Sequence, residues 1–172
     1  MAFVRYTKKH RKELSMSFNC GNMYLDNFLK EFKSLDSNIG ITYIYLNNDK
    51  SEIIAYFNIG TGSLIDNSSI DNIKIGGSVH LNCFALDKKY QGLQITTDKI
   101  LCKLSDYLLL MCINVIKNIK KYVGFSFITL YSTKQGYNLY KRMGFEELET
   151  DMELPYDSSE KKCKPMYLPL IE

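Results

Sequence analysis

Residues 79–131 decide the fold; they read VHLNCFALDKKYQGLQITTDKILCKLSDYLLLMCINVIKNIKKYVGFSFITLY. The mostly apolar run VHLNCFALD at 79–87 predicts a strand, and the run FSFITLY at 125–131 predicts another. Between them, residues 98–121 contain no Gly or Pro and predict one long helix, because their apolar residues recur at helical spacing. A strand–helix–strand crossover predicts that the two strands lie parallel. The apolar positions of the helix are Ile100, Leu101, Leu104, Leu108, Met111, Cys112, Val115, Ile116 and Ile119.

The chain before this segment predicts mostly antiparallel structure. Residues 3–6 suggest a short strand followed by a basic turn, and the stretch SFNCGNMYLDNFLKEFKS at 17–34 predicts an amphipathic helix. The runs ITYIYL at 41–46 and IIAYFNIG at 53–60 flank a turn cluster and predict a hairpin. Residues 60–78 are polar and rich in Gly, Ser and Asn, so they predict a long loop.

After residue 131 the pattern predicts one more helix and two extended segments. Ser132 through Gln135 match a capping box for a helix to about Met143, which Gly144 would end. Residues 145–149 and 165–170 are strand-like, and the prolines of the last run place it at an edge or at strand ends. The sum is one α+β domain over 1–172: a mostly antiparallel mixed sheet of about six or seven strands with one parallel pair, flanked by about four helices.

Composition sets broad limits. The chain has 172 residues, 45% hydrophobic and 24% charged, which is the size and balance of one globular domain. A net charge of +3 does not by itself indicate a nucleic-acid partner. Basic residues cluster at 8–12, 117–121 and 161–164, and these clusters fit either a phosphate-rich partner or solvated surface.

Cysteine usage and the chain start indicate a cytoplasmic protein. The five cysteines show no C-x-x-C spacing, so we expect reduced thiols in the core and no metal site. The first residues lack the apolar region of a signal peptide. The longest apolar run, 108–113, is far shorter than the ~18 residues of a membrane span, so we expect no membrane partner.

Two motifs resemble the GCN5-related N-acetyltransferase superfamily: the strand, loop and helix start at 81–98, and LYKRMGF at 139–145. The resemblance implies acetyl-CoA as co-substrate, with its pyrophosphate on the loop and on helix N-terminal amides. Gln91 falls at the Arg/Gln position of the family loop, whereas Gln94 and Thr96 replace its glycines. The loop therefore either retains binding through its backbone amides, or is only a turn; Asp98 would oppose phosphate there. The implied cofactor contacts are Phe84, Ala85, Leu86, Gln91, Gly92, Leu93, Gln94, Ile95, Thr96, Thr97 and Thr133.

The resemblance also implies catalytic roles. Tyr140 matches the family's general acid, which protonates the departing thiolate. Asn82 stands where many members have a Glu, and an amide cannot take a proton. His80 lies two residues earlier, on the same strand face, and is either a base or a hydrogen-bonded structural residue. An acceptor amine of low pKa would need no strong base.

The acceptor is less defined. The stretch FNCGNMYLDNFL at 18–29 is similar to the start of a family branch that contains toxins acetylating the α-amine of aminoacyl-tRNA. Three hypotheses follow: an N-acetyltransferase acting on a primary amine, a tRNA-directed toxin, and a non-catalytic acyl-CoA-binding protein. An exposed terminal strand would favour a homodimer.

Overall fold

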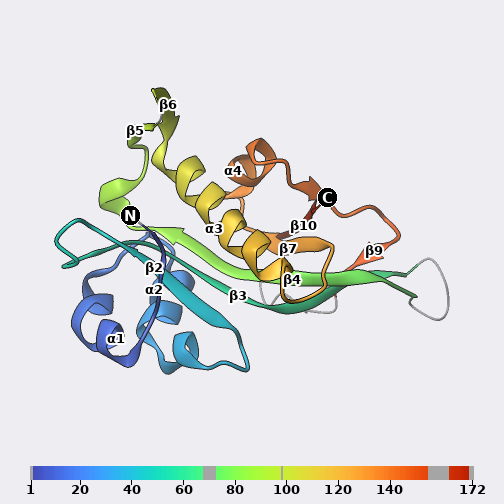
Figure 1. Cartoon of the computed structure of the whole chain (residues 1–172), viewed down its shortest axis with the longest axis horizontal. Helices are drawn as coiled ribbons and strands as arrows, with labels where there is room; N and C mark the ends of the chain where they lie inside the picture. The colour runs from blue at the N-terminus through green and yellow to red at the C-terminus, as the bar shows by residue number, and fades with distance from the viewer. Residues whose placement is uncertain (1, 68–72, 98, 155–162, 171–172) are drawn as a thin grey trace. The chain divides into compact units, whose positions relative to one another are not determined.

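A mixed β-sheet organises the chain in the computed structural model, which describes residues 2–67, 73–97, 99–154 and 163–170 (Figure 1). Among the described residues, eight strands form this sheet in the order β1-β2-β3-β4-β7-β10-β8, with β9 paired to β3. Two further strands, β5 and β6, form a separate hairpin. The strands of the sheet are β1 (Val4–Arg5), β2 (Ile41–Leu46), β3 (Ile53–Asp66), β4 (Ile73–Leu86), β7 (Phe127–Ser132), β8 (Glu146–Glu147), β9 (Met152–Glu153) and β10 (Lys164–Pro169).

The predicted parallel pair is confirmed. Residues Ser78–Leu81 of β4 lie opposite Phe127–Leu130 of β7 in parallel register. The β2–β3, β7–β10 and β8–β10 pairs are antiparallel. The fold is therefore the predicted α+β arrangement. Strand β10 has β7 on one side and β8 on the other.

Four α-helices accompany the sheet among the described residues. They are α1 (Lys8–Leu14), α2 (Met23–Lys30), α3 (Leu104–Lys120) and α4 (Tyr137–Arg142). The side chain of Thr7 caps α1 by accepting from the His10 amide, and the side chain of Asn22 caps α2 by accepting from the amides of Tyr24 and Leu25. Short 3₁₀ turns follow at η1 (Ser15–Ser17), η2 (Phe32–Leu35) and η3 (Lys88–Tyr90). No helix of the described chain is long and apolar enough to cross a membrane.

The chain divides into two compact units, and each unit draws on two separate stretches of sequence. The first unit comprises 1–59 and 83–113, and the second comprises 60–82 and 114–172. Burial in the first unit centres on large apolar side chains of α2, β2, β3 and the segment before α2, namely Phe18, Phe28, Leu29, Ile44 and Tyr56. In the second unit Leu64, Leu154 and Tyr167 form a smaller buried cluster.

Two of the predictions made from the sequence for the first half of the chain are wrong. The expected basic turn is helix α1, which has no buried residue and so gives no apolar periodicity to detect. The expected loop at 60–78 is largely strand, because β3 extends to Asp66 and β4 starts at Ile73. Its polar residues satisfy their backbone groups in the sheet, a tertiary effect that local composition does not reveal. Residues 68–72 lie outside the described part.

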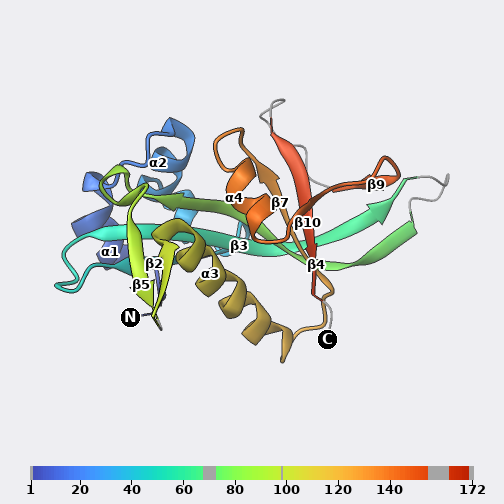
Figure 2. The ribbon, with the colours of Figure 1, turned by 90° about the horizontal axis from the view of Figure 1, so that it is seen from above.

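The predicted helix over 98–121 starts later than expected. Strands β5 (Gln94–Thr97) and β6 (Ile100–Lys103) form an antiparallel hairpin, and α3 begins only at Leu104. The hairpin projects at the amino end of α3 (Figure 2). Asp98 lies outside the described residues. The apolar spacing that continues back to Ile100 therefore overstates the helix by about one and a half turns.

The helix after β7 is shorter than predicted, and its capping box does not form. Ser132 ends β7, and its hydroxyl donates to the Thr133 carbonyl. Gly136 occupies the N-cap position without a side-chain cap. The predicted stop is confirmed: Gly144 has φ +87°, and Phe145 and Gly144 donate to the carbonyls of Tyr140 and Lys141 in a Schellman pattern.

Candidate active site

The carboxyl end of β4 is the first part of the candidate site. The parallel ladder with β7 ends at Leu81, whereas β4 itself continues to Leu86. The amide of Asp87 donates to the carbonyl of Ile54 at 2.9 Å, so β3 occupies one edge of the strand end. Ala85 and Leu86 are buried and Phe84 is half-buried, and Leu86 packs with Ala55 and Leu108. The side chains of Ala85 and Leu86 are thus core, so these two residues can serve a ligand only through their main chain.

The side chain of Gln91 is hydrogen-bonded within the protein. Its Nε2 donates to the carbonyl of Cys20 at 2.8 Å and to the carbonyl of Leu86 at 2.9 Å. A glutamine amide carries two donor hydrogens, so both are used. The side chain of Gln91 therefore has no further N–H group to offer to a phosphate.

The loop after Gln91 differs from the expected helix start. Gly92 has φ +76° and an open surrounding, with nothing within 4 Å of where a Cβ would lie. Gln94 to Thr97 belong to the hairpin, with Gln94 and Thr96 exposed and Ile95 and Thr97 half-buried. The first amide of α3, that of Leu104, donates to the carbonyl of Leu93 at 2.9 Å. The helical amides thus begin thirteen residues after the motif glutamine (104 − 91), not immediately after the loop.

In the second unit, His80 sits in a buried hydrogen-bond network. It is 5% exposed, and its Nδ1 lies 3.0 Å from the hydroxyl of Thr129, which lies 3.1 Å from the hydroxyl of Ser78. Burial lowers the pKa of His80 to about 4, because the charged imidazolium loses its hydration. His80 is therefore neutral at pH 7 and a weak base, whereas Asn82 on the same strand is exposed.

Tyr140 lies in α4, where its ring is held by close contacts. The side chain is 8% exposed, and its ring meets that of Phe145 edge-on at 5.5 Å between centroids. A Cβ on Gly136 would lie 3.0 Å from the Tyr140 ring, so the turn before α4 favours glycine. Thr133 shapes that turn, since its hydroxyl accepts from the Gly136 amide at 3.2 Å.

The predicted residues thus fall into two groups, one in each unit. The cofactor segment from Phe84 to Thr97 belongs to the first, and His80, Asn82, Thr133 and Tyr140 belong to the second. Sequence reasoning missed Asp87, a buried carboxylate at the end of β4. Its position as N-cap of η3 was the available signal, since Asp is a preferred capping residue.

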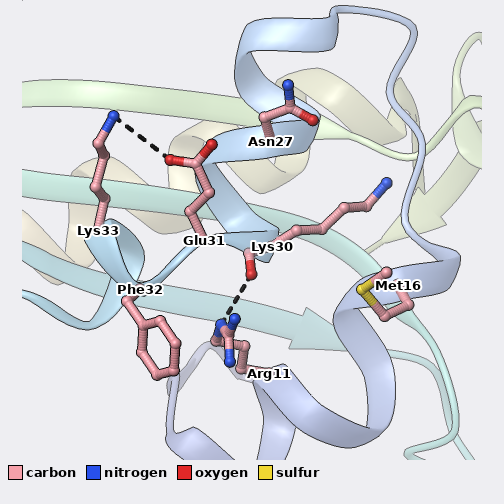
Figure 3. A pocket seen from close by; sticks show the side chains of 7 residues that line it. All are labelled: Arg11, Met16, Asn27, Lys30, Glu31, Phe32 and Lys33. Carbon is pink, nitrogen blue, oxygen red and sulfur yellow. Dashed lines mark hydrogen bonds and ion pairs between the residues drawn. The ribbon is translucent and has the colours of Figure 1, made fainter.

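A basic hollow on α1 and α2 is a further surface feature of the first unit (Figure 3). It has a volume of about 540 Å³. The guanidinium of Arg11 lies 3.8 Å from the centroid of the Phe32 ring, and its Nε donates to the carbonyl of Lys30 at 2.8 Å. Lys33 pairs with Glu31 at 3.4 Å. The lining residues are Arg11, Met16, Asn27, Lys30, Glu31, Phe32 and Lys33.

The described residues provide no obvious metal centre. Among them, no group of three or more His, Cys, Asp or Glu side chains is placed to hold a metal ion.

The sheet order, the parallel β4–β7 pair and the Tyr-x-x-x-Gly-Phe helix end define the fold of the GCN5-related N-acetyltransferases. Solved structures share it. AtaTR bound with acetyl-CoA matches with a TM-score of 0.72 and 19% identity, over 98% of this chain and 92% of that one. A tyrosine-to-phenylalanine mutant of KacT matches with a TM-score of 0.69 and 19% identity, over 98% and 95%. AtaT complexed with acetyl-methionyl-tRNAfMet matches with a TM-score of 0.65 and 19% identity, over 90% and 86%.

At this level of identity the likeness establishes the fold. No protein-family model matches the chain, and a search of curated protein sequences finds no match.

Proposed function

We propose that this protein is an acetyl-CoA-dependent N-acetyltransferase that acts on a primary amine by direct attack in a ternary complex. The observation that carries the proposal is the fold, shared over 98% of the chain with a protein solved with acetyl-CoA. The strand end at Phe84–Leu86, which continues beyond the ladder with β7, and Tyr140 in its Tyr-x-x-x-Gly-Phe motif add support. Acetyl-CoA is a co-substrate here, and the proposal involves no metal.

The proposed reaction uses few protein groups. The neutral amine attacks the thioester carbonyl carbon, and the C–N bond forms as the carbonyl oxygen becomes an oxyanion. Main-chain N–H groups of Phe84–Leu86 donate to that oxyanion. The C–S bond then breaks, and the thiolate of coenzyme A takes a proton from the Tyr140 hydroxyl. The attacking amine loses its extra proton to water, and water returns a proton to the Tyr140 phenolate, so the tyrosine is regenerated.

The properties of His80 argue for an acceptor of low pKa. A buried imidazole with a pKa of about 4 abstracts protons poorly at neutral pH. We therefore assign His80 and the exposed Asn82 a hydrogen-bonding role, and we propose that the amine enters already deprotonated. A general base acts only in its neutral form, so a general-base role of His80 predicts that His80→Ala lowers turnover above about pH 4 and little below it. A pH–rate profile of that variant tests this role.

The pyrophosphate contact is proposed for the backbone of Gly92–Thr97 and not for the Gln91 side chain. Leu93 to Thr97 offer amides and, at Gln94 and Thr96, exposed polar side chains. Thr133 is proposed as a further polar contact at the turn before α4. An anion gains most from such groups when several N–H donors converge on it.

Acetyl-CoA binding and Tyr140 chemistry test the proposal directly. Acetyl-CoA should raise the melting temperature of the purified protein, since a ligand that binds only the folded state stabilises it. Tyr140→Phe should lower the rate of acetyl transfer about 100-fold or more, because it removes the proton donor, and should leave acetyl-CoA affinity unchanged. Tyr137→Phe is the matched control on the same helix: its hydroxyl bonds Glu147 at the surface, and its loss should leave turnover unchanged.

Two results would count against the enzyme. No change in melting temperature at millimolar acetyl-CoA would exclude a cofactor site. A clear shift without transfer to any amine would instead favour a non-catalytic acyl-CoA-binding protein. Equal turnover of Tyr140→Phe and wild type would remove Tyr140 from the mechanism.

A second candidate acceptor is the α-amine of aminoacyl-tRNA, favoured by the charge of α1. This helix carries Lys8, Lys9, Arg11 and Lys12 against Glu13, a surplus of three positive charges (4 − 1) that equals the net charge of the whole chain. The basic hollow adds the exposed ring of Phe32 beside the Arg11 guanidinium. Basic side chains interleaved with aromatic rings suit a phosphate backbone with unstacked bases. An ester-linked α-amine also has the low pKa that the site requires.

This acceptor is tested with labelled acetyl-CoA and charged tRNA. The double variant Lys9→Glu, Lys12→Glu should raise KM for aminoacyl-tRNA and reduce its salt dependence, because phosphate contacts are lost. The control Lys117→Glu, Lys121→Glu makes the same charge change in the second unit and should have a smaller effect. Equal loss in both variants would mean that α1 is not a specific contact. Transfer only to small amines would exclude the tRNA acceptor.

A further inference from the structure

The segment Phe18–Gly21, here called the leader of α2, is fastened to the end of β4 within the first unit. The amide of Asn19 donates to Asp87 Oδ2 at 2.8 Å, and the carbonyl of Asn19 accepts from the Lys88 amide at 2.8 Å. One residue further along, the carbonyl of Cys20 accepts from Gln91 Nε2. These contacts join positions about 70 residues apart in the sequence.

The carboxylate of Asp87 lies at this junction between the leader and the end of β4. The residue is 5% exposed, and both of its carboxylate oxygens accept main-chain N–H groups: Oδ1 from Lys89 at 3.0 Å and Oδ2 from Asn19. A buried carboxylate is stable only when its oxygens are satisfied in this way. The leader therefore supplies one of the two donors that the carboxylate needs.

Gln91 makes the second connection. Its amide nitrogen bridges the leader carbonyl at Cys20 and the strand carbonyl at Leu86, and so holds both in one geometry. Leu86 is the last residue of β4, beside the main-chain groups proposed to contact the cofactor.

Hydrogen bonds also connect the leader to α2, and α2 to β3. The amide of Cys20 donates to Asp26 Oδ1 at 2.7 Å, and the hydroxyl of Tyr56 donates to the carbonyl of Leu25 at 2.7 Å. Gly21 has φ +88°, and a Cβ there would lie 2.5 Å from the Lys88 side chain. The junction and α2 thus form one connected hydrogen-bonded body.

A polar hollow of about 490 Å³ lies along this junction. The leader supplies part of its wall, together with α2 and the side chain of Lys88. The lining residues are Met16, Ser17, Phe18, Asn19, Gly21, Met23, Asp26, Asn27, Lys30 and Lys88. A change in the leader therefore changes the wall of this hollow.

We propose that Gln91 and Asp87 are positioning residues, which hold the leader and the polar hollow in register with the cofactor strand so that the acceptor amine is oriented. The proposal rests on the acetyltransferase function. It differs from the role that the family motif implies for Gln91, because here Gln91 acts on the acceptor side and does not touch the phosphates.

Gln91→Met is the decisive variant, since it removes both donors without adding charge. We expect KM for the acceptor to rise about 3- to 10-fold, the scale of a lost hydrogen bond, while the acetyl-CoA dissociation constant stays unchanged. Gln91→Arg restores two donors and should recover the wild-type KM. A fall in acetyl-CoA affinity with an unchanged acceptor KM would overturn the proposal and make Gln91 a phosphate contact.

A measurement without substrate separates this proposal from the proposed function. Hydrogen exchange of the peptide amides around Asn19 and Cys20 should be faster in Gln91→Met and in Asp87→Asn than in wild type, because the fastening is lost. Gln135→Met, an exposed glutamine of the second unit, is the control and should leave this exchange unchanged. Unchanged exchange in Gln91→Met would refute the fastening even if the enzyme is active. Faster exchange in a protein that transfers no acetyl group would instead refute only the proposed function.

Discussion

At the scale of single residues, the burial of His80 makes the stability of the folded protein depend on pH. Its pKa is lowered from 6.5 to about 4 by burial, so the folded state binds fewer protons than the unfolded state between these values. The stability contribution of neutral His80 is present above pH 6.5 and is lost as pH falls toward 4. From 1.36 kcal/mol per pKa unit, the loss amounts to about 3 kcal/mol.

Urea unfolding between pH 4 and 7 measures this effect. His80→Gln carries no titratable group there and should show a flatter dependence of the unfolding free energy on pH than wild type. Parallel slopes for His80→Gln and wild type would show that His80 does not drive the acid sensitivity.

At the scale of elements, the end of α4 isolates the energetic role of one glycine. Gly144 needs φ +87°, but a Cβ there would meet Leu168 only at an ordinary 3.6 Å. Gly144→Ala should therefore destabilise the protein through backbone strain alone, by about 1–2 kcal/mol. Gly124→Ala is the matched control, because Gly124 has no positive φ and nothing within 4 Å of its Cβ position.

Thermal and urea unfolding of both variants give the comparison. Gly124→Ala should be neutral or slightly stabilising, since alanine restricts the unfolded chain. A loss for Gly124→Ala as large as for Gly144→Ala would mean that the Schellman turn does not account for the difference. Tyr140 lies in the turn that Gly144 ends. We therefore expect the acetyl-transfer rate of Gly144→Ala to fall together with its stability.

Elements with a strong local pattern were predictable from the sequence. Strand β2 coincides with the predicted 41–46, and the parallel pair of β4 and β7 follows from the long apolar stretch between them. Helix α1 was not predictable, because its sequence KKHRKEL buries no residue. The extension of β3 and β4 through a polar stretch was hidden as well, since strand pairing there depends on distant partners.

The elements that carry the candidate residues were predictable from the sequence, but the contacts of those residues were not. The structure has the predicted strand, which ends at Leu86, and the predicted helix stop at Gly144. The engagement of Gln91 with Cys20 could not be foreseen, because the partners lie 71 positions apart. Nor could the hairpin before α3, since Ile100 and Leu101 continue the helical spacing and yet are 67% and 63% exposed.

At the scale of the whole molecule, the reactivity of each cysteine thiol depends on how deeply the thiol is buried. Burial raises the pKa of Cys20 and of Cys83 to about 12, and raises that of Cys112 well above its ordinary value. These three are buried, whereas Cys102 and Cys163 are half-buried. Because the thiolate is the reactive form, brief alkylation of the native protein at pH 8 should label Cys102 and Cys163 first.

Mass spectrometry of the alkylated peptides distinguishes the two classes. Unfolding in urea before labelling should make all five cysteines react at similar rates. Early labelling of Cys83 in the native protein would contradict the buried position of β4. The pattern is also a check on the core of each variant described above.

The two-segment composition of each unit has a consequence for synthesis on the ribosome. All residues of the first unit are present once the chain has reached residue 113, whereas the second unit awaits β10 at Lys164–Pro169. At roughly 5–20 residues per second, the interval is on the order of 3–12 s. We expect the first unit to gather its contacts early, with residues 60–82 looped out of it. Half of the sheet would thus be exposed on the nascent chain for seconds, which is long enough for a chaperone to bind it.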